Sequence, residues 1–162
     1  MSFALFTTDR HARPAAHRRI AITGAPHTGK TTLAYQLAGQ LADHPRVVST
    51  DTYMALGWSE CSQRVADILG GMINDGPWHG IVEGVAVPRA LRKMLRDAPD
   101  QKPVEKLIIL ETVHGEPLTA RQDGMGKGLL TVLLGPVDKD VPGSPIVLDE
   151  LRRLGVEIEV RS

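Results

Sequence analysis

One octapeptide constrains the fold of this chain more than any other segment: Gly24-Ala25-Pro26-His27-Thr28-Gly29-Lys30-Thr31. A short apolar run at residues 20–23 precedes it, and this run has the character of a buried strand. After it, apolar residues recur at helical spacing over residues 31–41. Its two glycines permit a tight turn that other residues rarely adopt. The segment therefore predicts a strand, a compact loop and a helix in direct succession.

The rest of the chain continues this alternation. Further strands are predicted at residues 47–50, 81–82, 106–110 and 156–160, and helices at residues 59–73, 88–96, 121–134 and 144–154. Ser144 and Pro145 are suited to the cap and first turn of the last helix. Continuous apolar runs such as residues 106–110 are typical of strands in a parallel sheet. We expect a three-layer α/β/α sandwich with a five-stranded parallel sheet, whose strand carboxyl ends share one ligand-binding edge.

Composition bounds the class of protein. The length of 162 residues fits one domain, and 42% hydrophobic with 23% charged residues is ordinary for a globular chain. Nineteen basic and nineteen acidic residues give no net charge, which argues against a general nucleic-acid clamp. The single cysteine, Cys61, excludes an intrachain disulfide and a cysteine zinc cluster. No run approaches the roughly 18 apolar residues of a membrane helix. We expect a cytoplasmic protein without a membrane partner.

The zero net charge hides an uneven distribution. Residues 1–19 contain four arginines and one aspartate, so they carry +3 and the remainder carries −3. We expect residues 1–18 to form a flexible basic arm and residues 19–162 to form the folded domain. A short transit peptide, or an arm that contacts nucleic acid or an acidic partner, stays open as an alternative.

The octapeptide matches G-x-x-x-x-G-K-[ST], the phosphate-binding loop. In such a loop, backbone N–H groups and the following helix N-terminus surround phosphate oxygens. Lys30 is expected on the β- and γ-phosphates, Thr31 on Mg²⁺, and Thr32 on a further phosphate oxygen. The ligands we expect are therefore ATP or another nucleoside triphosphate, together with Mg²⁺. The expected nucleotide-binding residues are Gly24, Ala25, Pro26, His27, Thr28, Gly29, Lys30, Thr31 and Thr32.

With this loop in an α/β chain, residues 19–160 resemble the small P-loop kinases, the nucleoside and nucleotide kinase-like group, in layout. Val47-Val48-Ser49-Thr50-Asp51 is similar to the acidic segment after the second strand of shikimate, gluconate and polynucleotide 5′-hydroxyl kinases. The resemblance implies that Asp51 faces the acceptor hydroxyl or the metal shell, where a carboxylate can accept or orient a proton. An aspartate that only begins a turn is the alternative.

Three more charged positions follow from the same resemblance. Glu83, at the end of the third strand, would contact the acceptor or support magnesium, or else be a solvated strand-end acid. Glu111, after residues 106–110, is a rival acid for the magnesium role. Arg89 lies in the first turn of a predicted helix, on a basic stripe with Arg92, Lys93 and Arg96, and is placed to hold an anionic acceptor. Otherwise the stripe is a solvated helix face.

Residues 112–128 occupy the place of the kinase lid. Its basic residues are Arg121 and Lys127, and it lacks the arginine-rich pattern of the family. The resemblance implies that a cation there stabilises charge on the transferring phosphate. Trp58 and Tyr53, close to Asp51 in sequence, are suited either to the wall of an acceptor pocket or to the core.

These observations lead to an expected ATP- and Mg²⁺-dependent kinase that transfers the γ-phosphate to a hydroxyl of a small molecule, nucleoside or nucleotide. Lys30, Asp51 and Arg121 are the expected catalytic residues, and Asp51, Glu83 and Arg89 the expected acceptor-binding residues. Thr31 is the expected magnesium ligand, with Asp51 as a second candidate. Two alternatives remain open: an ATPase or nucleotide switch that acts on a macromolecular partner, and a polynucleotide 5′-hydroxyl kinase that uses the basic stripe and arm.

Overall fold

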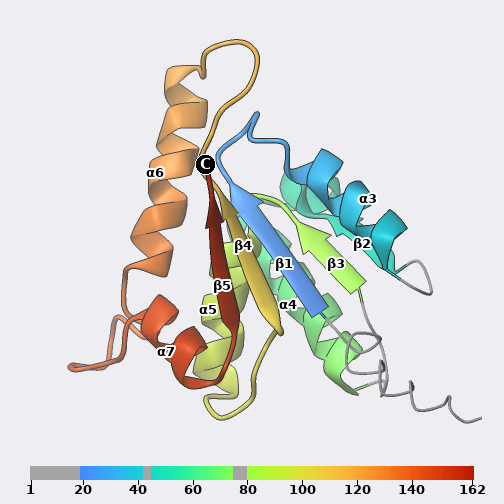
Figure 1. The fold of residues 1–162 in the computed structure, drawn as a ribbon. Helices are drawn as coiled ribbons and strands as arrows, with labels where there is room; N and C mark the ends of the chain where they lie inside the picture. The colour runs from blue at the N-terminus through green and yellow to red at the C-terminus, as the bar shows by residue number, and fades with distance from the viewer. Residues whose placement is uncertain (1–18, 42–44, 75–79) are drawn as a thin grey trace, which may run out of the picture.

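A computed structural model describes residues 19–41, 45–74 and 80–162 of the chain (Figure 1). The predicted basic arm at residues 1–18 lies outside these residues. The strands are β1 (Arg19–Gly24), β2 (Arg46–Ser49), β3 (Gly80–Glu83), β4 (Lys106–Leu110) and β5 (Glu157–Arg161). The helices are α3 (Lys30–Gln40), α4 (Trp58–Asn74), α5 (Val87–Asp97), α6 (Ala120–Leu133) and α7 (Val147–Arg153), with a 3₁₀ helix η1 (Thr50–Leu56).

The five strands form one parallel sheet in the order β2-β3-β1-β4-β5. This confirms the three-layer α/β/α fold and the five-stranded parallel sheet. β1 lies in the centre, where Ile22 is beside Glu83 of β3 and Gly24 is beside Leu110 of β4. The strand order therefore brings the carboxyl ends of β1, β3 and β4 together, although long stretches of chain separate them.

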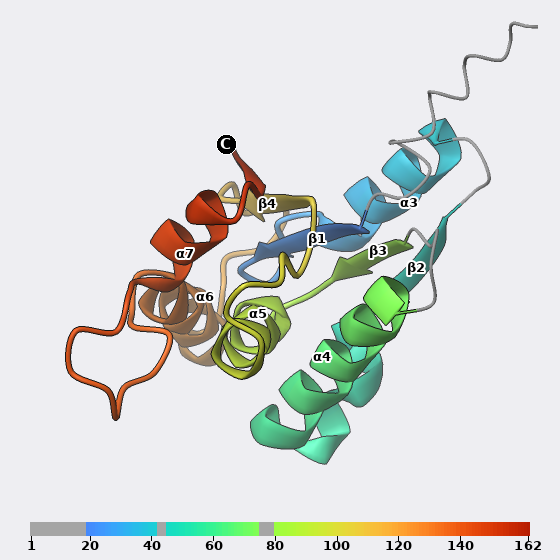
Figure 2. The same ribbon diagram turned by 90° about the horizontal axis from the view of Figure 1, so that it is seen from below.

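Helices cover the two faces of the sheet unequally, as the view from below shows (Figure 2). α3 packs alone on one face, where Ala34 and Ala38 contact the isoleucines of the central strands. α4, α5 and α6 lie on the other face, over a larger apolar core that includes Leu69, Leu91 and Leu133. Away from the edge strand β5, the strand interiors are apolar on both faces, as expected for a parallel sheet between helices.

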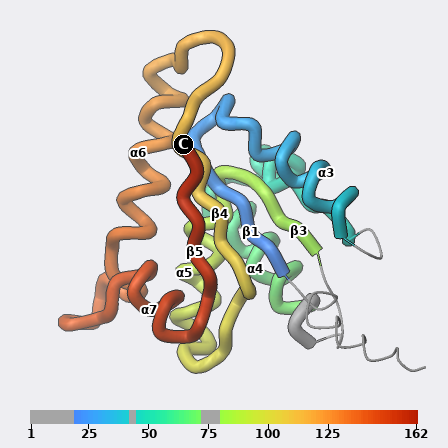
Figure 3. The backbone as a smooth tube through the Cα atoms, in the orientation of Figure 1, coloured from blue at the N-terminus to red at the C-terminus, as the bar shows by residue number. Residues whose placement is uncertain are grey.

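The edge strand β5 carries charge on the α3 face, because α3 does not extend over it. Lys106 of β4 contacts Glu159 at 2.7 Å and Glu157 at 3.3 Å, and Arg161 also pairs with Glu159. This part of the sheet has no covering helix, so charged side chains occupy positions where apolar ones would be exposed to water. The chain trace ends beside the carboxyl end of β4 (Figure 3).

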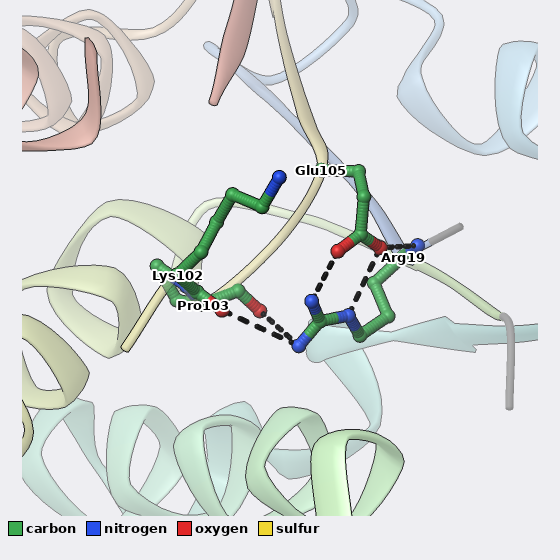
Figure 4. Close-up of polar contacts among 4 residues, drawn as sticks. All are labelled: Arg19, Lys102, Pro103 and Glu105. Carbon is green, nitrogen blue, oxygen red and sulfur yellow. Dashed lines mark hydrogen bonds and ion pairs between the residues drawn. The ribbon is translucent and has the colours of Figure 1, made fainter. Parts of the chain in front are cut away.

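Arg19 belongs to the sheet and not to the arm with which its charge was counted. Its guanidinium pairs with Glu105 just before β4, and its Nη1 reaches the carbonyls of Lys102 and Pro103 (Figure 4). The side chain is only 11% exposed in this pair, so its positive charge is largely neutralised. The contact joins the amino ends of β1 and β4, at the edge opposite the octapeptide.

One local prediction was wrong, and one helical turn was missed. The last helix begins at Val147, because Ser144 and Pro145 close the preceding loop instead of capping it. Ser144 Oγ accepts a bond from the Asp138 N–H at 2.9 Å, and the Pro145 carbonyl accepts one from Val137. Sequence analysis also gave no sign of η1, which places Asp51 in a helical turn directly after β2. Among the described residues, no helix is both long and apolar enough to cross a membrane.

Candidate functional site

The octapeptide leaves the carboxyl end of β1 at the point where the connections of neighbouring strands diverge. β1 continues into α3 on one face of the sheet, while β3 and β4 continue into α5 and α6 on the other (Figures 1 and 2). In open α/β sheets this divergence leaves a crevice beyond the strand ends, where ligands bind.

The backbone of the loop is shaped to present N–H groups. The Ala25 carbonyl accepts bonds from Thr28 Oγ1 and Lys30 Nζ, both at 2.8 Å. His27 has a left-handed φ of 65° and Gly29 one of 86°. Within the described part of the chain, the N–H groups of Ala25, His27, Thr28 and Gly29 donate no hydrogen bond. Successive N–H groups in such a turn form an anion-binding concavity, and the N-terminus of α3 adds its partial positive charge.

Two neighbouring segments hold this loop in place. The His114 N–H, in the segment between β4 and α6, donates to the His27 carbonyl at 2.7 Å. α6 passes so close to the loop that a Cβ on Gly126 would lie 2.9 Å from the Cβ of Ala25. Gly126 therefore lets α6 and the loop pack closely. The predicted lid segment rests against the phosphate loop.

Lys30 is buried at the N-terminus of α3, with its ammonium turned back toward the loop. Burial lowers the pKa of this ammonium below its ordinary value, although Glu83 and Asp51 act in the opposite direction. A buried lysine between two carboxylates is well placed to meet a polyanion, because its own hydration is already reduced.

Glu83 is the most unusual charged residue of the site. It is fully buried at the end of β3, and its Oε2 accepts a bond from Thr31 Oγ1 at 2.7 Å. Its Oε1 is buried without a hydrogen-bond partner among the described residues. An unpaired buried carboxylate oxygen is costly. The rival acid, Glu111, is exposed after β4 and makes no contact with Thr31.

One cavity of about 490 Å³, here called the phosphate cavity, brings most of the predicted site residues together. Asp51 lines it from η1 and Arg121 from α6, together with Lys30 and Thr31. The phosphate cavity is lined by Pro26, His27, Gly29, Lys30, Thr31, Thr32, Asp51, Met54, Val85, Arg121, Gln122 and Met125.

Arg89 does not line the phosphate cavity but lines a neighbouring one of about 300 Å³, here called the side cavity. Its guanidinium lies over the ring of Trp58, 4.8 Å from the centroid. The side cavity is lined by Trp58, Val85, Arg89, Arg121, Gly124, Met125, Gly128, Leu129 and Val132. Of the two aromatic candidates, Trp58 lines a pocket, while Tyr53 packs against the larger core.

Sequence reasoning missed Met125 as a contributor to the site. Met125 lines both cavities, and its spacing of four residues from Arg121 on one helix is the signal that would have placed them together. Gln122 closes a capping box with Thr119, and its amide nitrogen lies 3.5 Å from His27 Nε2. A Cβ on Gly84 would lie 1.8 Å from Thr50 Oγ1. The role of Gly84 is to let the ends of β2 and β3 pack.

The site fits the requirements of magnesium held together with a phosphate. Thr31 offers a hydroxyl, and the unpartnered Oε1 of buried Glu83 offers a negative oxygen beside it. Among the described residues no group of three or more His, Cys, Asp or Glu side chains is arranged to hold a metal ion. Magnesium usually binds through one or two protein oxygens plus waters and substrate phosphates, so it needs no complete protein cage.

A third cavity, of about 420 Å³, lies between α3 and the ends of β4 and β5, and we call it the α3 cavity. Thr28, Gly29 and Thr32 line it together with residues at the carboxyl ends of β4 and β5, including Leu110 and Arg161. The phosphate loop therefore has an open space on each side.

Comparison with known proteins finds no relative of this chain. No protein-family model, no curated protein and no solved structure matches the chain. The function must therefore be argued from the residues of the site.

Proposed function

We propose that this protein is an ATP-dependent, Mg²⁺-requiring kinase that transfers the γ-phosphate to a hydroxyl group of a small molecule. The observation that carries the proposal is the contact between Thr31 and the buried carboxylate of Glu83, beside Lys30 and four undonated loop N–H groups. An ordinary glycine-rich turn has no need of a buried acid next to its threonine. A site for a triphosphate and magnesium accounts for both.

The two cavities that flank the loop suggest how ATP would lie. The triphosphate would follow the N–H groups of the loop into the phosphate cavity, where Lys30 and Thr32 meet its oxygens. The nucleoside would occupy the α3 cavity, which begins at the same loop residues and contains Leu33 as an apolar surface. The γ-phosphate would then point toward Asp51 and Arg121.

In the proposed reaction each residue has one task. Lys30 neutralises charge on the β- and γ-phosphates, and Arg121 approaches the transferring group from α6. Asp51 orients the acceptor hydroxyl and takes its proton as the oxygen attacks phosphorus. Thr31, positioned by Glu83, would hold the metal together with the phosphates. Bound Mg²⁺ would supply neutralising charge to the phosphate oxygens.

The decisive experiment measures ADP release by the full-length protein over a panel of hydroxyl compounds. Acceptor-stimulated release that disappears in Lys30→Ala would support the proposal. The variant Asp51→Asn is expected to lose roughly 10²- to 10⁴-fold in transfer rate while it keeps its affinity for ADP. Slow ATP hydrolysis that no acceptor accelerates would overturn the kinase assignment.

The first alternative, an ATPase or switch protein, has its own support in the lid. Arg121 is the only arginine of the lid segment, and the Gln122 amide oxygen is already bound to the Thr119 N–H. Hydrolysis stimulated by a macromolecular partner, with no transfer to small molecules, would favour this alternative.

The polynucleotide kinase has less support from the basic stripe. Lys93 donates to the Ser59 carbonyl and Arg96 pairs with Asp97, so much of the stripe has partners within the protein.

A further inference from the structure

The outer edge of β5 has no partner strand in the described part of the chain. β5 is the last strand of the sheet, and it pairs with β4 on its inner side. Its five residues, Glu157–Arg161, include neither proline nor glycine. Proteins commonly protect such an edge with proline, a bulge or a covering segment, because its N–H and C=O groups can pair with another chain. An edge of this kind can accept a strand from a partner.

The backbone groups of β5 alternate between its two sides. The Glu157 N–H donates to a carbonyl just before β4, and the Arg161 carbonyl accepts a bond from the N–H that follows β4. These two residues therefore turn their backbone groups inward. Because the direction alternates along a strand, the N–H and C=O groups of Ile158 and Val160 point outward. The edge offers donors and acceptors at two positions, two residues apart.

The side chains on the α6 face of this edge are apolar and incompletely covered. Val160 is in register with Ile109 of β4, so the two side chains lie on the same face of the sheet. Val160 is 55% exposed, and Leu130 and Leu134, one turn apart on α6, are exposed as well. Leu130 and Ile109 line one cavity of about 290 Å³ between α6 and β4. An apolar margin thus extends from α6 toward the edge of the sheet.

The charges on the other face of β5 have a self-complementary order. They are Glu157, Glu159 and Arg161. When a second β5 runs antiparallel about Glu159, Glu157 of each copy lies opposite Arg161 of the other. In the same register Ile158 lies opposite Val160, so the outward backbone groups meet as hydrogen-bonded pairs. Opposite charges and β-branched side chains in such cross-strand pairs are stabilising.

Other registers fit less well. A shift by two residues in one direction places Glu157 opposite Glu159, where the like charges repel. A shift in the other direction leaves Glu157 and Ile158 of each copy outside the paired strands. In the favoured register the two Glu159 side chains meet at the centre, and Lys106 and Arg161 of their own copy already neutralise each of them.

We propose that the outer edge of β5 docks a second copy of this chain. The two copies pair antiparallel about a two-fold axis at Glu159, and their sheets become one continuous sheet. Val160 of each copy is then covered by Ile158 of the other, and the outward N–H groups of each strand donate to the carbonyls of its partner. The interface lies outside the phosphate cavity, so it does not rest on the proposed kinase function.

Sedimentation equilibrium of the full-length protein tests the proposal. Pairing of two edges buries a small area, so we expect reversible association with a Kd on the order of 1–100 µM. The mass should rise with concentration from 17.6 kDa toward twice that value. Amide hydrogen exchange of Ile158 and Val160 should slow roughly tenfold or more at high concentration. The Glu157 N–H, already bonded within the chain, should not change.

Charge reversal tests the register. Glu157→Lys and Arg161→Glu each place like charges opposite one another when the variant pairs with itself, so each should raise the Kd roughly ten- to hundredfold. An equal mixture of the two variants restores both opposite-charge pairs and should recover most of the parent affinity. Arg46→Glu, an exposed reversal on the opposite edge strand β2, is the matched control and should behave as the parent.

A proline variant tests the backbone bonds separately. Val160→Pro removes an outward N–H and leaves the bonds between β5 and β4 in place, so it should abolish association while circular dichroism shows a retained fold. A monomer at every concentration would overturn the proposal, and so would a dimer that survives Val160→Pro or charge variants that do not recover on mixing. Weaker association in Arg46→Glu alone would place the interface at β2 instead.

Discussion

At the scale of single residues, the buried carboxylate of Glu83 is the clearest sign of a ligand site. Burial of a charged group is costly unless it is fully paired, and one of its oxygens has no partner among the described residues. Buried charged groups with incomplete pairing are found mainly at functional sites. The oxygen that is paired holds the Thr31 hydroxyl in one orientation.

The variant Glu83→Gln tests this role. The amide oxygen can still accept the Thr31 bond, but the negative charge beside it is lost. We expect a fall of roughly 10- to 100-fold in Mg²⁺-dependent turnover or in apparent Mg²⁺ affinity, measured by initial rates over a magnesium titration. Glu111→Gln, at the exposed end of the neighbouring strand, should change neither value. The reverse pattern would transfer the role to Glu111.

Gly84 is the residue on which the packing of the strand ends depends. With φ at 142° and Thr50 Oγ1 1.8 Å from the position of a Cβ, Gly84→Ala should destabilise the fold by about 1–3 kcal/mol. Chemical denaturation measures this loss. Gly39→Ala, at a helix position with open space around it, should instead be neutral or stabilise by up to about 1 kcal/mol. Equal stability of the two variants would contradict the packing role.

At the scale of elements, α6 acts on the site through its contact with the phosphate loop. Arg121 and Met125 reach the cavities from the helix, and Gly126 sets its distance from Ala25. The helix position therefore determines where Arg121 lies relative to the phosphate loop.

Gly126→Ala should displace α6, because the added Cβ would lie 2.9 Å from the Ala25 Cβ. We expect a roughly 10- to 100-fold lower kcat in acceptor-stimulated ADP release, since a displacement of about 1 Å can cost 10²-fold in rate. Circular dichroism should show a retained fold. If Gly126→Ala matched Gly39→Ala in rate, the helix position would be irrelevant to turnover.

The edge strand β5 gives a prediction about pH. Bonds from Arg161 and Lys106 lower the pKa of Glu159 from its ordinary 4.5 to about 2. A lowered folded-state pKa means that ionised Glu159 stabilises the fold above pH 4.5 and that this stabilisation is lost as the pH falls toward 2.

Glu159→Gln should therefore lower the unfolding temperature at pH 7, and the difference from the parent protein should shrink between pH 4.5 and pH 2. Thermal unfolding at a series of pH values measures this. Glu116→Gln, in the exposed segment before α6, serves as the control and should show no such trend. A difference that is constant with pH would exclude the charge of Glu159 as its cause.

At the scale of the whole molecule, the site lies where the two differently covered faces of the sheet meet. α3 carries the predicted phosphate-binding residues on one face, and α5 and α6 carry the two arginines on the other. A nucleotide bound between them would connect both layers to the sheet, so binding should stabilise the entire fold.

Mg·ADP at 100 times its Kd should add about 2.7 kcal/mol to the unfolding free energy. For a chain of this size that corresponds to a rise of roughly 5–10 °C in Tm, measured by calorimetry. Lys30→Ala should show no rise when its Tm with Mg·ADP is compared with its own Tm in buffer. A ligand effect that survives in Lys30→Ala would place the nucleotide elsewhere.

The sheet and the tight loop between β1 and α3 could be predicted because their signals are local. An apolar run such as Leu107–Leu110, and the pattern of glycines before Lys30, are complete within a few residues. The choice between Glu83 and Glu111 was not local, because it depends on which strand end lies beside Thr31. Both β3 and β4 flank β1, and only the packed structure shows that the carboxylate of β3 reaches the threonine.

The contact between Arg89 and Trp58 could not be predicted from the sequence for a similar reason. Each residue was singled out separately, but they belong to helices that meet only through the packing of α4 on α5. The predicted cap of α7 was wrong because Ser144 has two possible partners. Its hydroxyl accepts a bond from the N–H of Asp138 in the preceding loop instead of from an N–H of the helix.

The phosphate loop is held from several directions: by β1 before it, by the His114 N–H at the carbonyl of His27, and by α6 at Ala25. A flexible segment loses conformational entropy when it closes around a ligand, and that loss reduces the affinity. In this loop most of the ordering accompanies folding, so the proposed binding of a nucleotide would require little additional loss of entropy. The left-handed backbone conformation of His27 is uncommon outside glycine and raises the energy of the folded chain. This energy is present before any ligand binds, so binding would not add it.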